Sequence, residues 1–237
     1  NSNFGKTEAW YIVGGRQING VEPYVLLGFK EGVTRESWRD LFLKQDREGM
    51  IESLHKITVK QGDVFLINGG VPHAIGSGCF LIEIQEPTDY TLRVERITPA
   101  GYRVPDSACH QGLGFDKLFD CFNYETANYE ENISKWKVEP EVIRVEQGGR
   151  ETVLIGTKNT SCFRMHSIDV VNKITGLNTE TFCIAVVLEG EGSIFTDNCQ
   201  IKVKQGDEFF IPAAIENITW YNEGQGEMKV ILCYPPD

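Results

Sequence analysis

The sequence is poor in the patterns on which several metal and redox sites depend. Its 237 residues include four histidines with no His-x-His pattern, and seven cysteines with no Cys-x-x-Cys pair. The first absence argues against a histidine-rich iron site, and the second argues against a zinc knuckle or a disulfide framework. Widely spaced cysteines of odd number fit reduced thiols, so we expect a cytoplasmic protein.

Basic residues are also in short supply. Lysine and arginine number 23 against 34 aspartate and glutamate residues, which gives a formal net charge of −11. Nucleic acids and anionic membranes both require a basic face, so we expect neither as a partner. No apolar run reaches the length of a membrane span, and no signal-peptide pattern is visible. An anionic small molecule would need a local cluster of basic side chains to bind.

Short runs of β-branched and aromatic residues dominate what is present. They are separated by Gly, Asn, Asp and Pro, a pattern typical of β-strands joined by turns. The sequence therefore predicts a mainly β protein. The runs lie at 9–13, 24–28, 56–59, 64–68, 80–85, 91–97, 141–145, 152–156, 163–171, 181–189, 192–195, 208–211 and 229–234.

One segment, 34–54, has helical rather than alternating spacing of its apolar residues. Thr34 is suited to cap the start of a helix, because its hydroxyl can accept a hydrogen bond from a backbone N–H of the first turn. Gly49 is expected to divide the segment into two helices. We interpret it as a short helical insertion between strands.

An internal repeat gives the clearest information on organisation. The motif KQGDVFLINGGVPH at 60–73 returns as KQGDEFFIPAAIEN at 204–217. Each copy contains a Gly-Asp turn, an apolar strand and a turn of small residues, so the repeat predicts two similar barrels in tandem. We place the first at 1–101, a linker at 102–137 and a second, degenerate barrel at 138–237.

The two copies of the repeat differ at their last position, where His73 is replaced by Asn217. A single histidine in a β protein is more often packed or solvated than functional. A structural histidine would however be expected to recur with its turn. The pattern Gly-x5-Asn-Gly-Gly-x2-His resembles the second motif of the cupin superfamily, with Asn68 in place of the usual proline. We therefore expect His73 to face a barrel interior and bind a metal, and the second barrel to lack one.

Three motifs together resemble the type I mannose-6-phosphate isomerases, in their short bacterial and archaeal branch. They are GKTEAWYI at 5–12, KQGD followed by GGVPHAI within 60–75, and EIQEPTDYTLR at 83–93, where Thr88 replaces the family's serine. The resemblance covers essentially the whole chain and is strongest over 5–97. It implies two tandem cupin barrels and an enzyme that interconverts mannose 6-phosphate and fructose 6-phosphate through a cis-enediol.

The resemblance also implies a set of site residues. Glu8 and His73 match zinc ligands of the family, and Arg93, Lys6 and Glu83 match catalytic positions. Each has an ordinary alternative, since a Lys-x-Glu pair is usually a solvated strand edge and an arginine usually pairs with a neighbouring carboxylate. Their presence in register with His73 favours the site. The implied cofactor is Zn²⁺, and the implied partner is a sugar phosphate bound by a monomer or homodimer.

One family motif has no match here. The family takes further zinc ligands from a Gln-x-His-Pro segment upstream, and His55, His110 and His166 do not lie in such a motif. Because the chain also begins with Asn1 rather than methionine, we expect its first part to be missing. The alternative is a catalytically inactive cupin that binds or senses sugar phosphate. A third hypothesis, an iron-dependent cupin oxygenase, is disfavoured by the scarcity of histidine.

Overall fold

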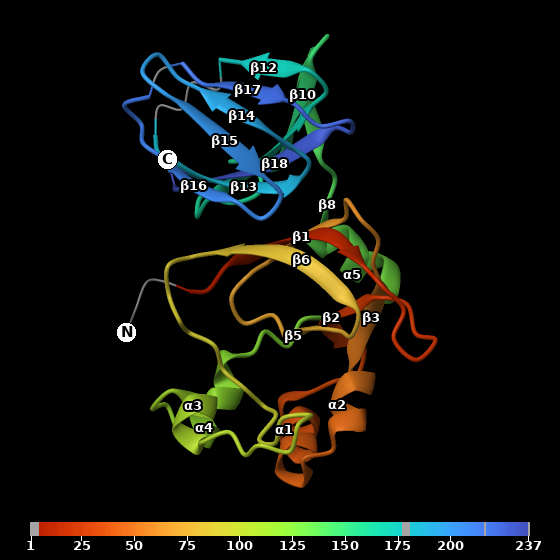
Figure 1. Ribbon diagram of the computed structural model, residues 1–237. Helices are drawn as coiled ribbons and strands as arrows, with labels where there is room; N and C mark the ends of the chain where they lie inside the picture. The colour runs from red at the N-terminus through yellow and green to blue at the C-terminus, as the bar shows by residue number, and fades with distance from the viewer. Residues whose placement is uncertain (1–4, 177–180, 216, 237) are drawn as a thin grey trace. The chain divides into compact units, whose positions relative to one another are not determined.

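The chain folds into two compact units, Asn1–Lys137 and Val138–Asp237, and both are built mainly from antiparallel β-strands (Figure 1). The prediction of a mainly β protein is thereby confirmed. The opening residues 1–4 and Glu216 in the second copy of the repeat lie outside the described residues. The structure is a computed structural model that describes residues 5–176, 181–215 and 217–236.

Unit 1 contains two principal sheets, ordered β6-β1-β4-β8 and β3-β2-β5, with β7 parallel to β2. Alternation along β1 and β2 sends Trp10, Val25 and Leu27 into one core together with Phe65 of β4. All four are buried. The strands are β1 (Glu8–Gly15), β2 (Tyr24–Lys30), β3 (Leu54–Thr58), β4 (Val64–Ile67), β5 (His73–Ile75), β6 (Cys79–Gln85), β7 (Thr126–Ala127) and β8 (Lys137–Val138).

The helical insertion is confirmed as α1 (Arg35–Lys44) and α2 (Arg47–Glu52), with Thr34 capping the first helix. The division of the segment, however, falls earlier than predicted. Gln45 has a left-handed backbone (φ 50°) and ends α1, while the Asp46 side chain accepts a hydrogen bond from the backbone N–H of Gly49. Gly49 therefore belongs to the first turn of α2, because the cap at Asp46 decides where the second helix begins.

The segment 102–137, expected to be a linker, is instead part of unit 1. Leu118 and Phe119 are fully buried against Trp38 and Phe42 of α1, so the segment contributes to a second apolar core beside the insertion. Figure 1 shows α1 to α4 gathered on the side of unit 1 away from β1 and β6. The elements are α3 (Asp106–His110), α4 (Phe115–Leu118), the 3₁₀ turn η1 (Phe119–Cys121) and α5 (Tyr129–Trp136).

The run 91–97, expected to be a strand, is irregular apart from one isolated bridge at Ile97. The Gln45 side chain accepts a hydrogen bond from Arg96 N at 2.8 Å and donates one to Val94 O at 3.1 Å. Val94 also packs against the aromatic cluster of the helices. Side-chain contacts with the insertion thus replace the ladder that an alternating apolar pattern predicts.

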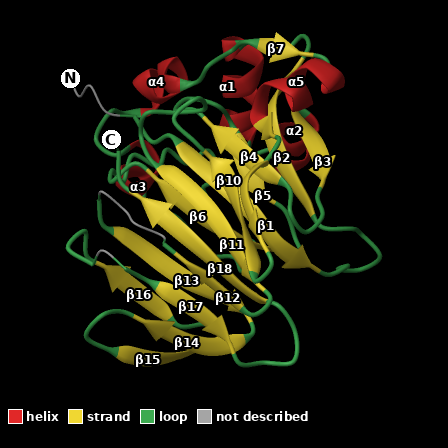
Figure 2. Ribbon diagram, turned by 90° about the horizontal axis from the view of Figure 1, so that it is seen from above, coloured by secondary structure: helices red, strands yellow, loops and turns green. Residues whose placement is uncertain are grey.

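Unit 2 has two sheets, ordered β16-β13-β18-β11-β10-β9 and β12-β17-β14-β15. Their inner faces enclose an apolar core around Trp220, Val230 and Ile168. Figure 2 shows strands of these antiparallel sheets, such as β11, β18 and β13, side by side. The strands are β9 (Glu141–Glu146), β10 (Gly149–Ile155), β11 (Arg164–Val170), β12 (Lys173–Thr175), β13 (Cys183–Glu189), β14 (Glu191–Phe195), β15 (Gln200–Lys204), β16 (Glu208–Ile211), β17 (Thr219–Asn222) and β18 (Met228–Tyr234).

The Gly-Asp turns of the repeat have the same geometry in both units. Asp63 Oδ2 accepts from Lys60 N at 2.9 Å, and Asp207 Oδ2 accepts from Lys204 N at 2.9 Å. The glycine before each aspartate has a positive φ, 91° in the first copy and 90° in the second. This backbone region is open to glycine and costly for other residues, which explains why both copies carry glycine there.

The seven cysteines are all free thiols. Within the described ranges, the longest helix has ten residues, and none is long and apolar enough to cross a membrane.

Candidate functional site

The candidate site of unit 1 starts on β1 and the residues just before it. Lys6, Glu8 and Trp10 alternate along the chain and share one face. Glu8 pairs with Ile67 of β4 and with Gln85 of β6, so its backbone is held on both sides. Its side chain is 1% exposed. The ladder therefore fixes a buried carboxylate at the inner face of the sheet.

His73 reaches the same carboxylate from β5. Its Nε2 lies 2.7 Å from Glu8 Oε1. The other ring nitrogen, Nδ1, lies 2.7 Å from the carbonyl oxygen of Val71. A carbonyl only accepts, so Nδ1 carries a proton and donates it. The second ring nitrogen, Nε2, faces Glu8.

Lys6 and Glu83 complete the cluster. The Lys6 ammonium contacts Glu8 Oε2 and lies 3.4 Å from Glu83 Oε1. The other Glu83 oxygen accepts a hydrogen bond from Trp10 Nε1 at 3.2 Å. Trp10 also packs edge-on against the ring of His73, with 5.5 Å between the centroids. Four of the five predicted site residues are thus brought together, although up to 77 positions separate them in the chain.

The charges of this cluster stabilise one another. Burial by itself would raise the pKa of Glu8, but the contacts with His73 and Lys6 outweigh it and lower that pKa below its ordinary value. Burial likewise opposes the charge on Lys6, and the contacts with Glu8 and Glu83 outweigh it, so the pKa of Lys6 is raised. Both residues are therefore charged at neutral pH.

Glu8 and His73 have the features of a pair of metal ligands. Glu8 Oε1 is buried and has no hydrogen-bond partner among the described residues. Because Nδ1 of His73 donates its proton to Val71 O, Nε2 of the neutral ring keeps an electron pair that can bind a metal, and metal-binding histidines commonly donate their other ring N–H in this way. Carboxylate oxygen and imidazole nitrogen are both zinc ligands. No group of three or more His, Cys, Asp and Glu within the described ranges is arranged to hold a metal, so these two residues fit part of a ligand set.

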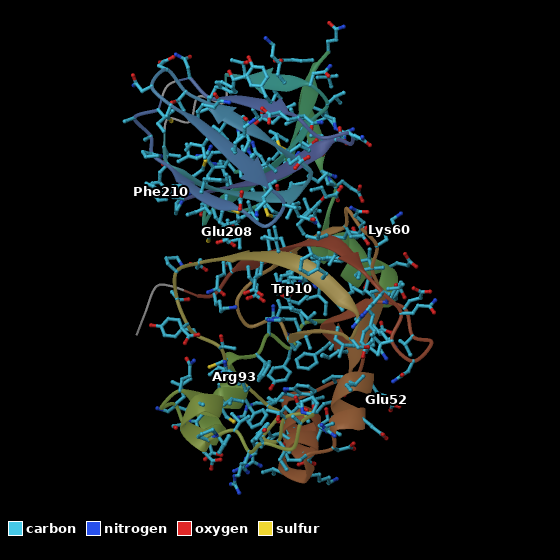
Figure 3. The ribbon with its side chains drawn as sticks, in the orientation of Figure 1. Trp10, Glu52, Lys60, Arg93, Glu208 and Phe210 are labelled. Carbon is cyan, nitrogen blue, oxygen red and sulfur yellow. The ribbon has the colours of Figure 1, made fainter. Side chains whose placement is uncertain are left out.

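Arg93 lies apart from this cluster. Its guanidinium donates to the carbonyl oxygens of Thr91 at 3.2 Å and Ala108 at 3.0 Å. Figure 3 shows Arg93 beside α3, with Trp10 beneath the ribbon of β6. The contacts of Arg93 in the described part of the chain include none with Glu8 or His73. Its guanidinium is therefore held by the 91–110 segment and does not join the Glu8 cluster.

The remaining histidines have local partners. His55 is buried, and its Nε2 lies 2.9 Å from Ala127 O. His110 packs edge-on against Phe115. His166 Nδ1 lies 3.0 Å from Glu151 Oε1 in unit 2. Each of these contacts accounts for its histidine without a metal.

Trp10 and Glu86 lie inside the motifs, although neither has a role predicted from the sequence. The position of Trp10, two residues after Glu8, was the available signal, since it places the indole on the same face. Glu86 carried no such signal, because its partner Thr7 is 79 residues away.

Unit 2 has a different residue in the place of Glu8. The pairing of Glu8 with Ile67 in unit 1 corresponds to that of Cys183 with Ile211 in unit 2, because both isoleucines hold the same position in the repeat. Cys183 is 1% exposed and packs in the apolar core of its unit. Asn217 stands in the place of His73, and its amide lies 3.3 Å from Asp197 Oδ2.

Comparison with known proteins agrees with this architecture. Residues 157–235 match the family model "Mannose-6-phosphate isomerase, cupin domain". Over 225 residues, 94% of this chain, the sequence is 27% identical to a mannose-6-phosphate isomerase of Streptococcus mutans. Over 94 residues, 40% of this chain, it is 33% identical to mannose-6-phosphate isomerase ManA of Bacillus subtilis. The crystal structure of a mannose 6-phosphate isomerase from Bacillus subtilis superposes on 97% of the chain with a TM-score of 0.73 at 22% identity.

The domain matched by residues 157–235 is a cupin domain, and the fold of the chain is that of a solved mannose 6-phosphate isomerase. Over most of its length, the chain is similar to mannose-6-phosphate isomerases at 25–27% identity. It spans less than two thirds of the length of its relatives, 63% of the Streptococcus mutans protein and 65% of the Bacillus subtilis structure.

Proposed function

We propose that this chain carries the catalytic barrel of a zinc-dependent mannose-6-phosphate isomerase, followed by a second cupin barrel without metal ligands. The observation on which this rests is the convergence of Glu8 and His73, 2.7 Å apart, with Lys6 beside them. The names of the relatives supply the reaction, the interconversion of mannose 6-phosphate and fructose 6-phosphate. The two similar Gly-Asp turns support the tandem arrangement of barrels.

The reaction moves a proton between C2 and C1 of the sugar through a cis-enediol. Negative charge develops on the sugar oxygens when the C2 proton leaves, so the site must place positive charge near them. Glu8 and His73 would hold zinc, which when bound supplies such a charge as a Lewis acid. The Lys6 ammonium lies against the same carboxylate and adds a second positive group.

Proton transfer needs a group that can reach the two carbons. Glu83 is the first candidate, because Trp10 orients one of its oxygens while its side chain remains one third exposed. Lys6, or a water held by either side chain, is the alternative. Arg93 is the candidate for binding the phosphate or the developing charge, since a guanidinium is a fixed cationic fork.

The competing hypothesis is a cupin that binds sugar phosphate without turning it over. It is favoured by the two-residue ligand set, since catalytic zinc normally has three protein ligands and an open position. Free thiols at all seven cysteines support a reducing compartment such as the cytoplasm for either protein.

Turnover in the presence of zinc separates the two hypotheses. The assay converts mannose 6-phosphate to fructose 6-phosphate with these 237 residues and with the longest natural protein that contains them. The isomerase predicts turnover that is lost in Glu8→Gln and His73→Ala and retained in Cys183→Ala. Binding of mannose 6-phosphate by calorimetry with no turnover by either protein, at verified zinc loading, would favour the binding protein.

A further inference from the structure

We infer that Glu86 is a positioning residue that holds Lys6 in the site, an inference that rests on the proposed function. Glu86 follows directly after β6, and its partner is Thr7, the residue between Lys6 and Glu8. The side chain of Glu86 itself contacts the backbone rather than the site.

Glu86 makes two hydrogen bonds with the backbone of Thr7. The Glu86 carboxylate Oε2 accepts a hydrogen bond from the Thr7 N–H at 2.7 Å. The Glu86 N–H donates to the Thr7 carbonyl oxygen at 2.9 Å. A hydrogen bond to an ionised carboxylate is shorter and stronger than one between neutral groups, so this pair fixes one residue of the chain firmly.

Two further contacts confine the same segment. Thr88 Oγ1 donates to the carbonyl oxygen of Gly5 at 2.7 Å. On the opposite side, Gly69 of the turn that leads to His73 lies beside the backbone of Gly5 and Lys6, where a Cβ on this glycine would make ordinary van der Waals contact with Lys6 N at 3.6 Å. Residues 5–7 are thus held between the Glu86–Thr88 turn and the His73 turn.

Lys6 depends on these contacts more than Glu8 does. Glu8 is the first residue of β1 and is paired on both sides, with Ile67 and Gln85. Lys6 precedes the strand and has no ladder partner among the described pairs. Without the Glu86 carboxylate, the Thr7 N–H loses its partner, so the chain before Glu8 would be held less firmly and the Lys6 ammonium would be less well placed. The loss should therefore affect Lys6 and spare the metal ligands.

The test compares Glu86→Ala with Glu86→Gln, which keeps a side-chain oxygen able to accept from Thr7. In Glu86→Ala we expect amide hydrogen exchange at Thr7 to accelerate at least about tenfold. Acetylation of Lys6 by acetic anhydride, followed by peptide mass mapping, should accelerate by a similar factor. Isomerase kcat should fall about 10- to 100-fold, the range expected for a misplaced catalytic group, while zinc affinity stays within about threefold. Glu86→Gln should restore all these readouts to near the wild-type values.

Glu52→Ala serves as the control, because it removes one exposed carboxylate from α2 and should change none of these quantities. Unchanged exchange at Thr7 and unchanged acetylation of Lys6 in Glu86→Ala would overturn the inference, as would equal losses in the Gln and Ala variants. A wild-type chain that turns over no substrate would instead count against the proposed function, and the exchange and acetylation readouts would still decide the role of Glu86.

Discussion

Cys183 of β13 stands in unit 2 where Glu8 of β1 stands in unit 1, each directly opposite the isoleucine that ends the strand of the repeated motif. The two units share a backbone arrangement and differ in what it presents. In unit 1 the position holds a buried carboxylate beside His73. In unit 2 it holds a thiol among apolar side chains. Because the two units share this arrangement, a substitution in unit 2 can serve as the control for the corresponding substitution in unit 1.

Metal affinity should depend on unit 1 alone. We expect His73→Ala and Glu8→Gln each to weaken zinc binding by at least about tenfold, because each removes one of the few ligands available. Cys183→Ala changes the corresponding position in unit 2 and should leave the affinity unaltered. Isothermal titration with zinc, repeated with cobalt for its absorption spectrum, measures all three. Equal weakening by the cysteine variant would contradict this assignment.

The indole N–H of Trp10 should matter for catalysis rather than for stability alone. Trp10→Phe removes the donor to Glu83 and keeps an aromatic ring beside His73. We expect kcat to fall about tenfold, because an unrestrained carboxylate is less well placed for proton transfer.

Trp220→Phe is the matched control for that change. Trp220 is fully buried, and its Nε1 has no hydrogen-bond partner among the described residues. Both variants should lower the free energy of unfolding by about 1–3 kcal/mol, the usual range for a core substitution, yet only Trp10→Phe should lower kcat. An unchanged kcat in Trp10→Phe would show that the indole N–H of Trp10 does not contribute to catalysis.

The two Gly-Asp turns should respond alike to substitution. Gly62→Ala and Gly206→Ala place a Cβ at φ values of 91° and 90°, where no atom lies within 4 Å. The cost is therefore backbone strain alone, and we expect each to lower the free energy of unfolding by about 1–2 kcal/mol. Gly14→Ala, which has equal space and no positive φ, should cost less. Denaturant titration of all three tests whether strain or packing governs these turns.

Alkaline pH should destabilise unit 2 through Cys183. Burial raises the pKa of this thiol to about 11 from an ordinary value of 9.0. Between these two values the unfolded thiol loses its proton while the folded one keeps it. The unfolded state then binds fewer protons, so the free energy of unfolding falls as pH rises, by up to about 1.4 kcal/mol per pH unit. Below pH 9 the contribution is constant.

Cys183→Val isolates this effect, since valine is similar in size and does not titrate. The difference in free energy of unfolding between wild type and variant should be flat at neutral pH and change between pH 9 and pH 11. A difference that stays flat across that window would show that folding does not raise the pKa of the Cys183 thiol.

Local signals in the sequence were sufficient for features that depend on neighbouring residues. Thr34 was predicted to begin a helix and does, because a cap needs only the residues of the next turn. The break at Gln45 was missed because Gly49 is the more conspicuous helix breaker, whereas the Asp46 cap decided the boundary. Residues 102–137 were predicted to be a linker because they are rich in Gly, Asp and Asn and show little periodicity. Their apolar residues, Leu118 and Phe119 above all, find partners in a distant helix.

The sequence by itself determined the repeated turns, the mainly β fold and the shared face of Lys6, Glu8 and Trp10, since these follow from glycine conformation and strand alternation. Tertiary structure decided that Glu83 joins Lys6, that Arg93 lies with the 91–110 segment, and that Glu86 holds Thr7. These relationships depend on the register between β1 and β6, strands separated by more than sixty residues. Register is fixed by the fit of the whole buried face, which no short stretch of sequence contains.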